Sequence, residues 1–389
     1  DEPSIGLHPS NIVGLTRVME DLVADGNSVL LVDHDTQILR EADWILEMGP
    51  EAGANGGQVV AQGTVEELGR CPASQIGPFL TGEAQVLVRQ RAAEKDLFQR
   101  GAIRLATGAI HTVKPLEVAI PQGRLTVVTG VSGSGKTTMV LESLIPGLEA
   151  ATAGEKLPGH VREVDAPGIR RVKLIDATPI GINVRSTVAT YAGVHDELRK
   201  VFARTPDAKE QGYKAGDFSY NTGKLRCPTC DGTGQISLDV QFLPDVDIPC
   251  PDCGGSRYSG AAAEVRLAGD ISLPELLSYT VDQAPDALAE TGLRSAKAKL
   301  AVLSDLGLGY LTLGEATPAL SGGEAQRLKL ASELTRSQED ALFVFDEPTI
   351  GLHPLDVEVL LGVLQRLIDN GATVVVIEHD LDMIANADW

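Results

Sequence analysis

Short apolar runs alternate with longer amphipathic stretches over much of the chain. RLTVVTG at 124–130, ALFVF at 341–345 and TVVVI at 373–377 are short and apolar, with many β-branched residues, which is typical of buried strands. VEVLLGVLQRLIDNG at 357–371 instead has the spacing of an amphipathic helix, with Gly371 as its C-terminal stop. Strands that alternate with helices predict an α/β core with a mostly parallel sheet.

The two ends of the chain repeat each other. Residues 1–44 align without a gap with residues 346–389, with 18 identities in 44 positions. DEPSIGLHP in the first copy matches DEPTIGLHP in the second, and SVLLVDHD matches TVVVIEHD. This repeat predicts two related modules. Because the first copy starts inside a motif, we expect a fragment that holds the tail of one module and nearly all of the next.

Composition and charge favour a globular protein of the cytoplasm. Of the 389 residues 43% are apolar, and 33 basic against 54 acidic residues give a net charge of −21. That length allows two or three domains with buried cores. No apolar run reaches the roughly 18 residues of a membrane span, and no basic-then-apolar pattern marks secretion, so we expect a soluble protein of the cytoplasm. The acidic balance argues against nucleic-acid binding by the chain as a whole, although a local basic face is compatible with it.

A phosphate-binding loop follows the first predicted strand. GVSGSGKT at 130–137 fits the pattern G-x-x-x-x-G-K-[ST], in which backbone N–H groups turn inward around phosphate oxygens. The lysine is expected to reach the β- and γ-phosphates, and the threonine hydroxyl to hold Mg²⁺. An ordinary Gly/Ser-rich turn is the alternative, which the strand–loop–helix setting disfavours. The predicted nucleotide-binding residues are Gly130, Ser132, Gly133, Ser134, Gly135, Lys136, Thr137 and Thr138.

Two carboxylates end the apolar run in FVFDEP. Asp346 is placed to bind the Mg²⁺ shell and Glu347 to polarise the attacking water. A turn with solvated charges is the alternative, which the upstream phosphate loop makes less favourable. His379 follows the TVVVI run, and its recurrence in the first copy favours a shared role in contacting the γ-phosphate over a structural one. The first-copy counterparts are Asp1, Glu2 and His34.

LSGGEAQRLKLA at 320–331 completes the set of phosphate-directed motifs. A serine hydroxyl and backbone N–H groups at the start of a helix can donate hydrogen bonds to a γ-phosphate. As a bare pattern the same letters are also a helix cap, with a glutamate in the first turn. The residues assigned to this signature are Ser321, Gly322, Gly323 and Glu324.

Four of the five cysteines form two CxxC pairs, with 19 residues between the pairs. The pattern C-x₂-C-x₁₉-C-x₂-C lies within the spacing of a tetrahedral zinc site. Redox pairs and reduced core cysteines are the alternatives. The predicted zinc ligands are Cys227, Cys230, Cys250 and Cys253, whereas Cys71 stands apart from them.

The order phosphate loop, signature, Asp-Glu and His resembles that of the ABC ATPases. A zinc-bearing insertion between loop and signature, where transporter ATPases have none, resembles the UvrA family. RSTVATYAGVHDELRKVFA at 185–203, GYKAGDFSYN at 212–221 and FLPDVDIPCPDCGGSRYS at 242–259 carry the same resemblance. It implies an ABC-type nucleotide-binding core, a helical signature subdomain, an inserted zinc module, and a site closed by the signature of another module.

The sequence departs from the UvrA pattern in a few places. Ala177 stands where the family usually has a Gln that senses Mg²⁺ and the attacking water. Ile182 replaces one Arg, while the nearby Arg185 remains, and the phosphate loop ends in Thr-Thr rather than Ser-Thr. These differences indicate a divergent paralogue.

The motifs suggest five segments. Residues 1–82 are assigned to the end of the first ATPase module and 83–101 to a linker. The second ATPase core is expected at 102–180, the inserted DNA-binding and zinc module at 181–300, and the signature and Asp-Glu part at 301–389.

Residues 185–226 hold eight basic and five acidic residues, a local balance of +3. Solvated charge pairs explain such a balance equally well, and the family resemblance favours contacts to the DNA backbone that sense distortion. The residues assigned to DNA are Arg185, Lys214, Lys224 and Arg226.

The resemblance implies an ATP-hydrolysing subunit that recognises DNA damage, without nuclease chemistry of its own. ATP, Mg²⁺ and Zn²⁺ are the implied cofactors; damaged double-stranded DNA, a second copy of the chain and a UvrB-like repair subunit are the implied partners. A UvrA-like drug-resistance protein that removes intercalators is the first alternative. A transporter ATPase is the second, against which the zinc insertion argues.

Overall fold

The computed structural model describes residues 1–4, 6–50, 53, 56–176, 178, 180, 184–238, 246–267, 270–334 and 338–389. Its contacts divide the chain into two compact units, residues 1–177 with 336–389, and residues 178–335. Ala177 and Ile182, where the sequence departs from the family pattern, lie outside the described residues. Among the described residues, no helix combines the length and the apolar character that a membrane crossing needs.

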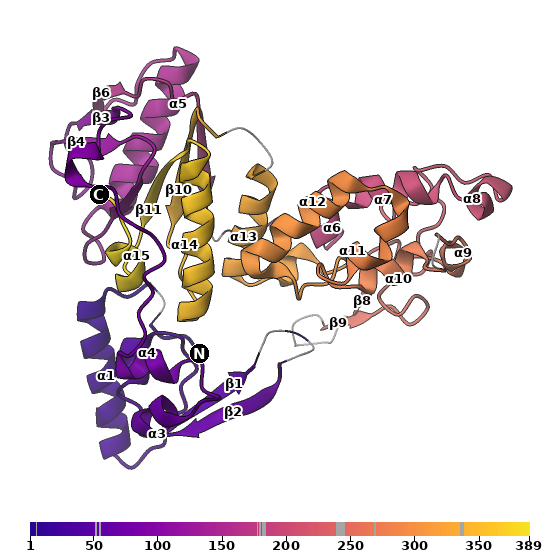
Figure 1. Ribbon diagram of the computed structural model, residues 1–389, viewed down its shortest axis with the longest axis horizontal. Helices are drawn as coiled ribbons and strands as arrows, with labels where there is room; N and C mark the ends of the chain where they lie inside the picture. Colours follow the sequence, from indigo (N-terminus) through magenta and orange to yellow (C-terminus); the bar gives the residue numbers. More distant parts are fainter. Residues whose placement is uncertain are drawn as a thin grey trace. The chain divides into compact units, whose positions relative to one another are not determined.

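The first unit is built around a parallel sheet (Figure 1). Its strands lie in the order β5-β11-β10-β7, and all three pairings are parallel. A three-stranded antiparallel sheet, β4-β3-β6, and a hairpin, β1-β2, belong to the same unit. The strands are β1 (Ile45–Gly49), β2 (Gln58–Gly63), β3 (Ala102–Thr107), β4 (Leu116–Pro121), β5 (Leu125–Val128), β6 (Val161–Asp165), β7 (Arg171–Ile175), β10 (Ala341–Asp346) and β11 (Thr373–Ile377).

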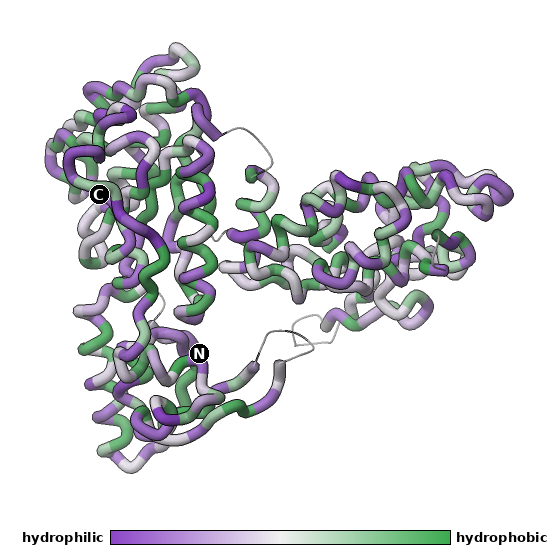
Figure 2. Tube along the Cα trace, viewed as in Figure 1, coloured by the Kyte–Doolittle hydropathy of each residue, from purple (hydrophilic) through white to green (hydrophobic). Residues whose placement is uncertain are grey.

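The helices of the first unit pack in more than one place. Their bounds are α1 (Pro9–Ala24), α2 (Thr36–Leu39), α3 (Val65–Arg70), α4 (Gly77–Thr81), η2 (Glu94–Asp96), η3 (Thr138–Leu144), α5 (Ile145–Ala153), α14 (Pro354–Asp369) and α15 (Leu381–Ala385). The helices η3 and α5 share a core with the parallel sheet, whereas α3 and α4 pack against the hairpin β1-β2. Successive residues of β10 point to opposite faces. Leu342 and Val344 therefore enter the core that η3, α5 and the antiparallel sheet share with β11. Apolar and polar residues alternate along α14 (Figure 2), and its apolar side is buried in the unit.

The parallel strands follow the apolar runs of the sequence. The runs at 124–130, 341–345 and 373–377 become β5, β10 and β11, which confirms the predicted parallel core. The predicted helix at 357–371 is α14, but it begins earlier, at Pro354. Proline suits a first helical turn, and the ring of His353 caps this turn by accepting from Leu355 N–H.

The first copy of the repeat differs from the second at SVLLV. Its counterpart β11 is a strand because β10 and β5 pair with it on both sides. Residues 28–32 are not in a sheet in this structure. One backbone hydrogen bond nevertheless has an equivalent in each copy. Glu2 N–H donates to Val32 O at 2.7 Å, and Glu347 N–H donates to Ile377 O at 2.9 Å. An apolar run thus forms a strand only where neighbouring strands complete its ladder.

The helix that follows the phosphate loop starts with a π-helical turn, η3, and continues as α5. Pro146 lies in the first turn of α5 and has no N–H to give to Glu142 O. A ring nitrogen of His160 lies 3.1 Å from that carbonyl oxygen and 3.1 Å from Ser143 Oγ. The His160 ring thus contacts a carbonyl oxygen that Pro146 cannot serve.

A buried ion pair fastens residues 89–92 to the end of the chain. Arg89 Nη2 lies 2.8 Å from Asp388 Oδ2, and the two side chains are 4% and 1% exposed. Asp388 also accepts from the N–H groups of Ala92 and Leu125, at 2.8 and 2.9 Å. The partners of the Asp388 carboxylate therefore come from residues 89–92, which precede β3, and from the first residue of β5.

We expect Arg89→Ala to lower the free energy of unfolding by about 3–5 kcal/mol, because it leaves the Asp388 carboxylate buried without its counter-charge. Denaturant unfolding of the chain measures this loss. Arg91→Ala is the matched control, since Arg91 is exposed and lies two residues away. Equal midpoints for the two variants would show that the pair contributes no net stability.

The second unit is mainly helical, and its only strand pair among the described residues is the antiparallel β8-β9. Its elements are α6 (Val188–Tyr191), α7 (His195–Phe202), α8 (Pro206–Glu210), β8 (Gln235–Leu238), β9 (Val246–Pro249), α9 (Gly260–Ala263), α10 (Leu273–Ser278), α11 (Ala284–Ala287), η4 (Ala289–Thr291), α12 (Arg294–Leu303), η5 (Ser304–Leu308), η6 (Thr317–Ala319) and α13 (Gly322–Glu333). The signature and the four paired cysteines both belong to this unit.

Candidate nucleotide centre and four-cysteine cluster

The predicted phosphate loop connects β5 to η3. Gly130, Gly133 and Gly135 have φ values of 147°, 76° and 96°, a region that side-chain-bearing residues rarely adopt. A Cβ atom on Gly135 would also lie 2.4 Å from Val113 Cγ2. Lys136 Nζ donates to Gly130 O at 2.8 Å and to Val131 O at 3.2 Å, so its ammonium group lies over the loop. The remaining predicted loop residues, Ser132, Ser134, Thr137 and Thr138, lie between these positions or directly after them.

Two carboxylates from the end of β10 face this lysine. Burial raises the pKa of Asp346, and the nearby carboxylates of Asp176 and Glu378 raise it further. Burial likewise raises the pKa of Glu347, with Glu378 and Asp346 acting in the same direction. Burial lowers the pKa of Lys136, whereas both carboxylates oppose that shift. The group has more negative than positive charge, and oxygen donors of this kind fit Mg²⁺.

His379 lies beside the glutamate. Its Nε2 is 3.5 Å from Glu347 Oε1, and its side chain is 8% exposed. Burial lowers the pKa of His379 to about 4, with further contributions from Lys136 and His8. The imidazole is therefore neutral at pH 7. Its Nδ1 is buried and has no hydrogen-bond partner among the described residues.

The sequence did not single out Glu378, which organises this centre. Its Oε1 accepts from Thr349 N–H at 2.9 Å and from the Thr349 hydroxyl. Its Oε2 accepts from the N–H groups of His379 and Asp380, at 2.5 and 3.0 Å. This carboxylate fixes the segment after Glu347 to the segment that carries the histidine. An acidic residue precedes the histidine in both copies, in EHD and in DHD, and this was the available signal.

The first copy has the same arrangement around Asp1, Glu2 and His34. Asp33 Oδ1 accepts from the Ser4 hydroxyl at 2.6 Å and from His34 N–H at 2.8 Å. His34 Nε2 lies 3.7 Å from Glu2 Oε1, in a pair that is more exposed than that of the second copy. Glu2 and Glu347 both have positive φ, 41° and 47°, an unusual conformation for glutamate. The local geometry of the two copies is thus closely similar.

The two copies face each other across a cavity of about 440 Å³. A Cβ atom on Gly6 would lie 3.5 Å from Glu347 Oε2, and one on Gly351 would lie 3.4 Å from Glu2 Oε2. Each glycine, at φ +67°, thus approaches the glutamate of the other copy. The rings of His8 and His379 meet edge to face, with centroids 5.6 Å apart.

Asp380, which lines this cavity, gives the centre a pH dependence. Burial raises its pKa to about 7, and the carboxylates of Glu378, Asp382 and Asp35 add to the shift. An acid whose pKa is raised on folding stabilises the fold fully below its unfolded value, near 3.8, and this contribution is lost as the pH rises through about 7. The native chain should therefore lose stability between about pH 4 and 7 through this residue.

We expect Asp380→Asn to melt several degrees higher than the unaltered chain at pH 8 and at almost the same temperature near pH 4. Asparagine keeps the cap that Asp380 provides to Met383 N–H but cannot ionise. Thermal unfolding across this pH range tests the difference. The control is Glu358→Gln, an exposed residue of α14, which should give no pH-dependent gain. A constant difference at all pH values would contradict the assignment.

The signature forms the start of α13. Glu324 N–H donates to Ser321 Oγ at 3.3 Å, and Ser321 N–H donates to Glu324 Oε2 at 2.7 Å, which is a complete capping box around Gly322 and Gly323. The hydroxyl of Tyr310 donates to the other carboxylate oxygen, Glu324 Oε1. The helix-cap geometry and the signature pattern therefore occur together, and Tyr310 is a positioning residue that the sequence did not indicate.

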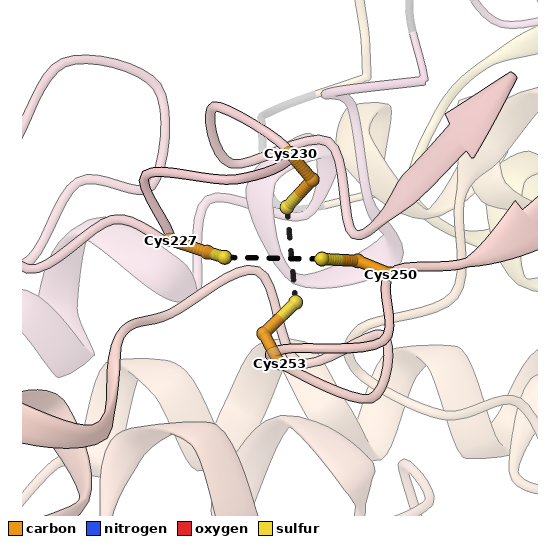
Figure 3. Close-up of side chains that lie close together, drawn as sticks. All are labelled: Cys227, Cys230, Cys250 and Cys253. Carbon is orange, nitrogen blue, oxygen red and sulfur yellow. Dashed lines mark hydrogen bonds between the residues drawn. The ribbon is translucent and has the colours of Figure 1, made fainter.

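The four paired cysteines converge on one point (Figure 3). Cys227 Sγ lies 3.9 Å from Cys250 Sγ, and Cys230 Sγ lies 3.7 Å from Cys253 Sγ. A tetrahedral zinc ion with Zn–S bonds of about 2.3 Å places its sulfurs about 3.8 Å apart, so the spacing fits. Gly234 N–H also donates to Cys230 Sγ at 3.3 Å, which suits a thiolate. The four sulfur atoms thus form one cluster, and its geometry is compatible with a zinc ion.

The four basic residues assigned to DNA have different surroundings. Arg185 and Arg226 both pair with the Asp231 carboxylate, with guanidinium nitrogen to carboxylate oxygen distances of 2.9 and 3.0 Å. Lys214 and Lys224 are exposed. Both arginines are thus paired with an aspartate within the unit, whereas the two lysines are exposed on the surface of the same unit.

Known proteins match the chain along its whole length, although a search of family models returned no match. UvrABC system protein A of Thermus thermophilus is 44% identical over 395 aligned positions, and that of Aquifex aeolicus is 43% identical over 393. Both alignments cover 100% of this chain but only 40% and 42% of the relatives, so the chain spans about two fifths of their length.

Among solved structures, the crystal structure of UvrA2 from Deinococcus radiodurans superimposes with a TM-score of 0.92 at 41% identity. The match covers 100% of this chain and 46% of the other. The sequence and fold comparisons thus both cover the whole of this chain. Over its whole length, the chain is therefore similar to proteins of the UvrA family.

Proposed function

We propose that this chain is the part of a longer, UvrA-like subunit that hydrolyses ATP to ADP and phosphate while the subunit recognises damaged DNA in nucleotide excision repair. The full-length similarity to UvrABC system protein A carries the proposal. We further propose that it works in the cytoplasm as a homodimer, recruits a UvrB-like subunit, and has no nuclease chemistry of its own.

The nucleotide chemistry follows from the phosphate loop and the end of β10. Lys136 and the loop N–H groups would hold the phosphates, and Thr137 with Asp346 would hold Mg²⁺. Bound Mg²⁺ would neutralise charge on the phosphates. Glu347 would orient and deprotonate the attacking water, which its burial-raised pKa favours. His379, neutral at pH 7, would contact the γ-phosphate.

The signature of one module would close over ATP held by the other, as the family resemblance implies. This chain carries one phosphate loop and one signature. We therefore propose that steady hydrolysis needs the longer protein with both modules, and that the isolated chain as a monomer binds ATP but does not turn it over continuously.

Damaged DNA should stimulate ATP hydrolysis by the longer protein more than intact DNA of the same sequence. ATPase rates with a lesion-bearing duplex, an intact duplex and a duplex loaded with an intercalator test the proposal. Stimulation by the intercalator-loaded duplex alone would favour the drug-resistance function instead. Absence of DNA binding at low salt would contradict both functions.

DNA contacts are expected from the exposed lysines. Lys214→Gln and Lys224→Gln should each weaken binding to all sequences and lower the slope of log K against log salt by about 1. Salt titrations of DNA affinity measure this change. Lys95→Gln, at an exposed lysine of η2 in the other compact unit, is the matched control. Equal salt slopes for all three variants would show that neither lysine contacts the DNA.

A further inference from the structure

Arg257 is a buried cation that pairs with no carboxylate in the part of the chain that the structure describes. It is 6% exposed and follows the last cysteine of the cluster by four residues. Its Nη1 donates to Val184 O at 2.8 Å and to Thr233 O at 2.7 Å, and its guanidinium carbon lies 5.4 Å from the centre of the Tyr220 ring. None of its contacts among the described residues is a carboxylate. Because an uncompensated buried charge is costly, negative charge is required nearby.

The four-cysteine cluster can supply this charge. Four thiolates and one divalent zinc ion together carry a charge of about −2. Arg257 lies directly against the cluster, because its own carbonyl oxygen accepts from Cys227 N–H at 2.9 Å. Its partner Thr233 lies between Cys230 and Gly234, whose N–H donates to the Cys230 sulfur. The guanidinium and a metal-loaded cluster would therefore neutralise each other.

The contacts of Arg257 also connect the cluster to the residues that precede the signature. Its acceptor Val184 directly precedes a segment that pairs with residues 313–317. Three backbone bonds of 2.9–3.0 Å join residues 186–189 to that run, from Val188 N–H to Glu315 O, from Ala189 N–H to Leu313 O, and from Thr317 N–H to Ser186 O. The capping serine of the signature follows four residues after the end of the run.

A second contact strengthens this connection. The guanidinium of Arg185 donates to Asp231 O at 2.6 Å and to Asp231 Oδ2 at 2.9 Å. Asp231 directly follows a cysteine of the cluster, and Arg185 directly follows Val184. Two adjacent residues thus connect the cluster to the segment that pairs with the signature lead-in.

We propose that Arg257 is a positioning residue that supplies the counter-charge of the metal-loaded four-cysteine cluster and ties the cluster to residues 184–189. Metal loading thereby orders residues 313–317, which lead into the signature. The inference rests on the metal site and is independent of hydrolysis, so its test uses metal binding and backbone protection.

The first measurement is the zinc affinity of the chain, by competition with a chromophoric chelator. Arg257→Gln should weaken zinc binding by about 10- to 100-fold, the usual cost of losing a group that supports metal ligands. Arg257→Lys keeps the positive charge and should recover most of the affinity. Arg266→Gln is the control, because Arg266 also forms ion pairs in this unit, with Asp270 and Glu275. Unchanged affinity in Arg257→Gln would overturn the counter-charge role.

The second measurement is hydrogen exchange of the amides of Val188, Ala189 and Thr317. Both chelation of the unaltered chain and Arg257→Gln should increase their exchange, whereas Arg266→Gln should leave it unchanged. If exchange of these amides stays the same when the metal is removed, the tie to the signature lead-in is wrong. Should Arg257→Gln fail to fold, hydrogen exchange of the chelated unaltered chain still tests the tie to the signature lead-in.

Discussion

Glu347→Gln is expected to slow ATP hydrolysis by about 10³-fold while ATP binding changes by only a few-fold. A general base contributes on the order of 10²–10⁴ to such a reaction, and the amide of glutamine cannot accept the proton. The replacement is nearly isosteric, so the approach of Gly6 and the contact with His379 remain possible. The loss should therefore fall on the chemical step.

Steady-state rates and nucleotide affinity of the longer protein, measured in parallel, separate binding from chemistry. The control Glu358→Gln changes an exposed glutamate on α14 and should leave both quantities unaltered. Lys136→Ala should instead weaken ATP binding itself, because it removes the ammonium group over the loop. A Glu347→Gln rate within tenfold of the unaltered protein would exclude Glu347 as the base.

Cys250→Ser should remove the bound metal and destabilise residues 178–335. Cys250 is fully buried at the cluster, and a serine hydroxyl is a poor zinc ligand. Structural zinc contributes apparent binding energies of about 10–16 kcal/mol in small domains, and part of this energy stabilises the fold. We expect the zinc content to fall from one ion per chain to none, and the melting of this unit to shift down by at least about 10 °C.

Elemental analysis and thermal unfolding test this expectation. Cys71→Ser is the matched control, because Cys71 ends α3 in the other compact unit and should affect neither zinc content nor melting. Chelation should reproduce the loss, and added zinc should reverse it, whereas Mg²⁺ should not. Equal zinc content in Cys250→Ser and Cys71→Ser would exclude the cluster as the metal site.

Local patterns predicted the parts of the structure that depend on local sequence. The strand at 373–377 coincides with its apolar run, because its flanking strands are present. The loop at 130–137 and the two CxxC pairs carry their geometry in fixed spacings, so a single sequence suffices to find them. The strand order β5-β11-β10-β7 was not predictable in this way, because it depends on contacts between distant segments.

The supporting residues of each site were missed for the same reason. Glu378 becomes important only when its oxygens meet Thr349, 29 positions away. Tyr310 reaches Glu324 over 14 positions, and Arg257 reaches Val184 over 73. Single polar residues of this kind have no spacing pattern of their own. The roles assigned to the phosphate-loop, signature and DNA-contact residues stay predictions until the variants above are measured.

Gly6 and Gly351 link two stretches of the gene that lie 345 codons apart. A Cβ atom at either glycine would be in van der Waals contact with the glutamate of the opposite copy, so a side chain that extends beyond Cβ would disturb the other half of the molecule. The φ of +67° at both positions also disfavours any residue with a side chain. Chimeras between relatives should therefore function only when both stretches come from the same parent. Inheritance of the two copies as a matched pair would follow from this reciprocal fit alone.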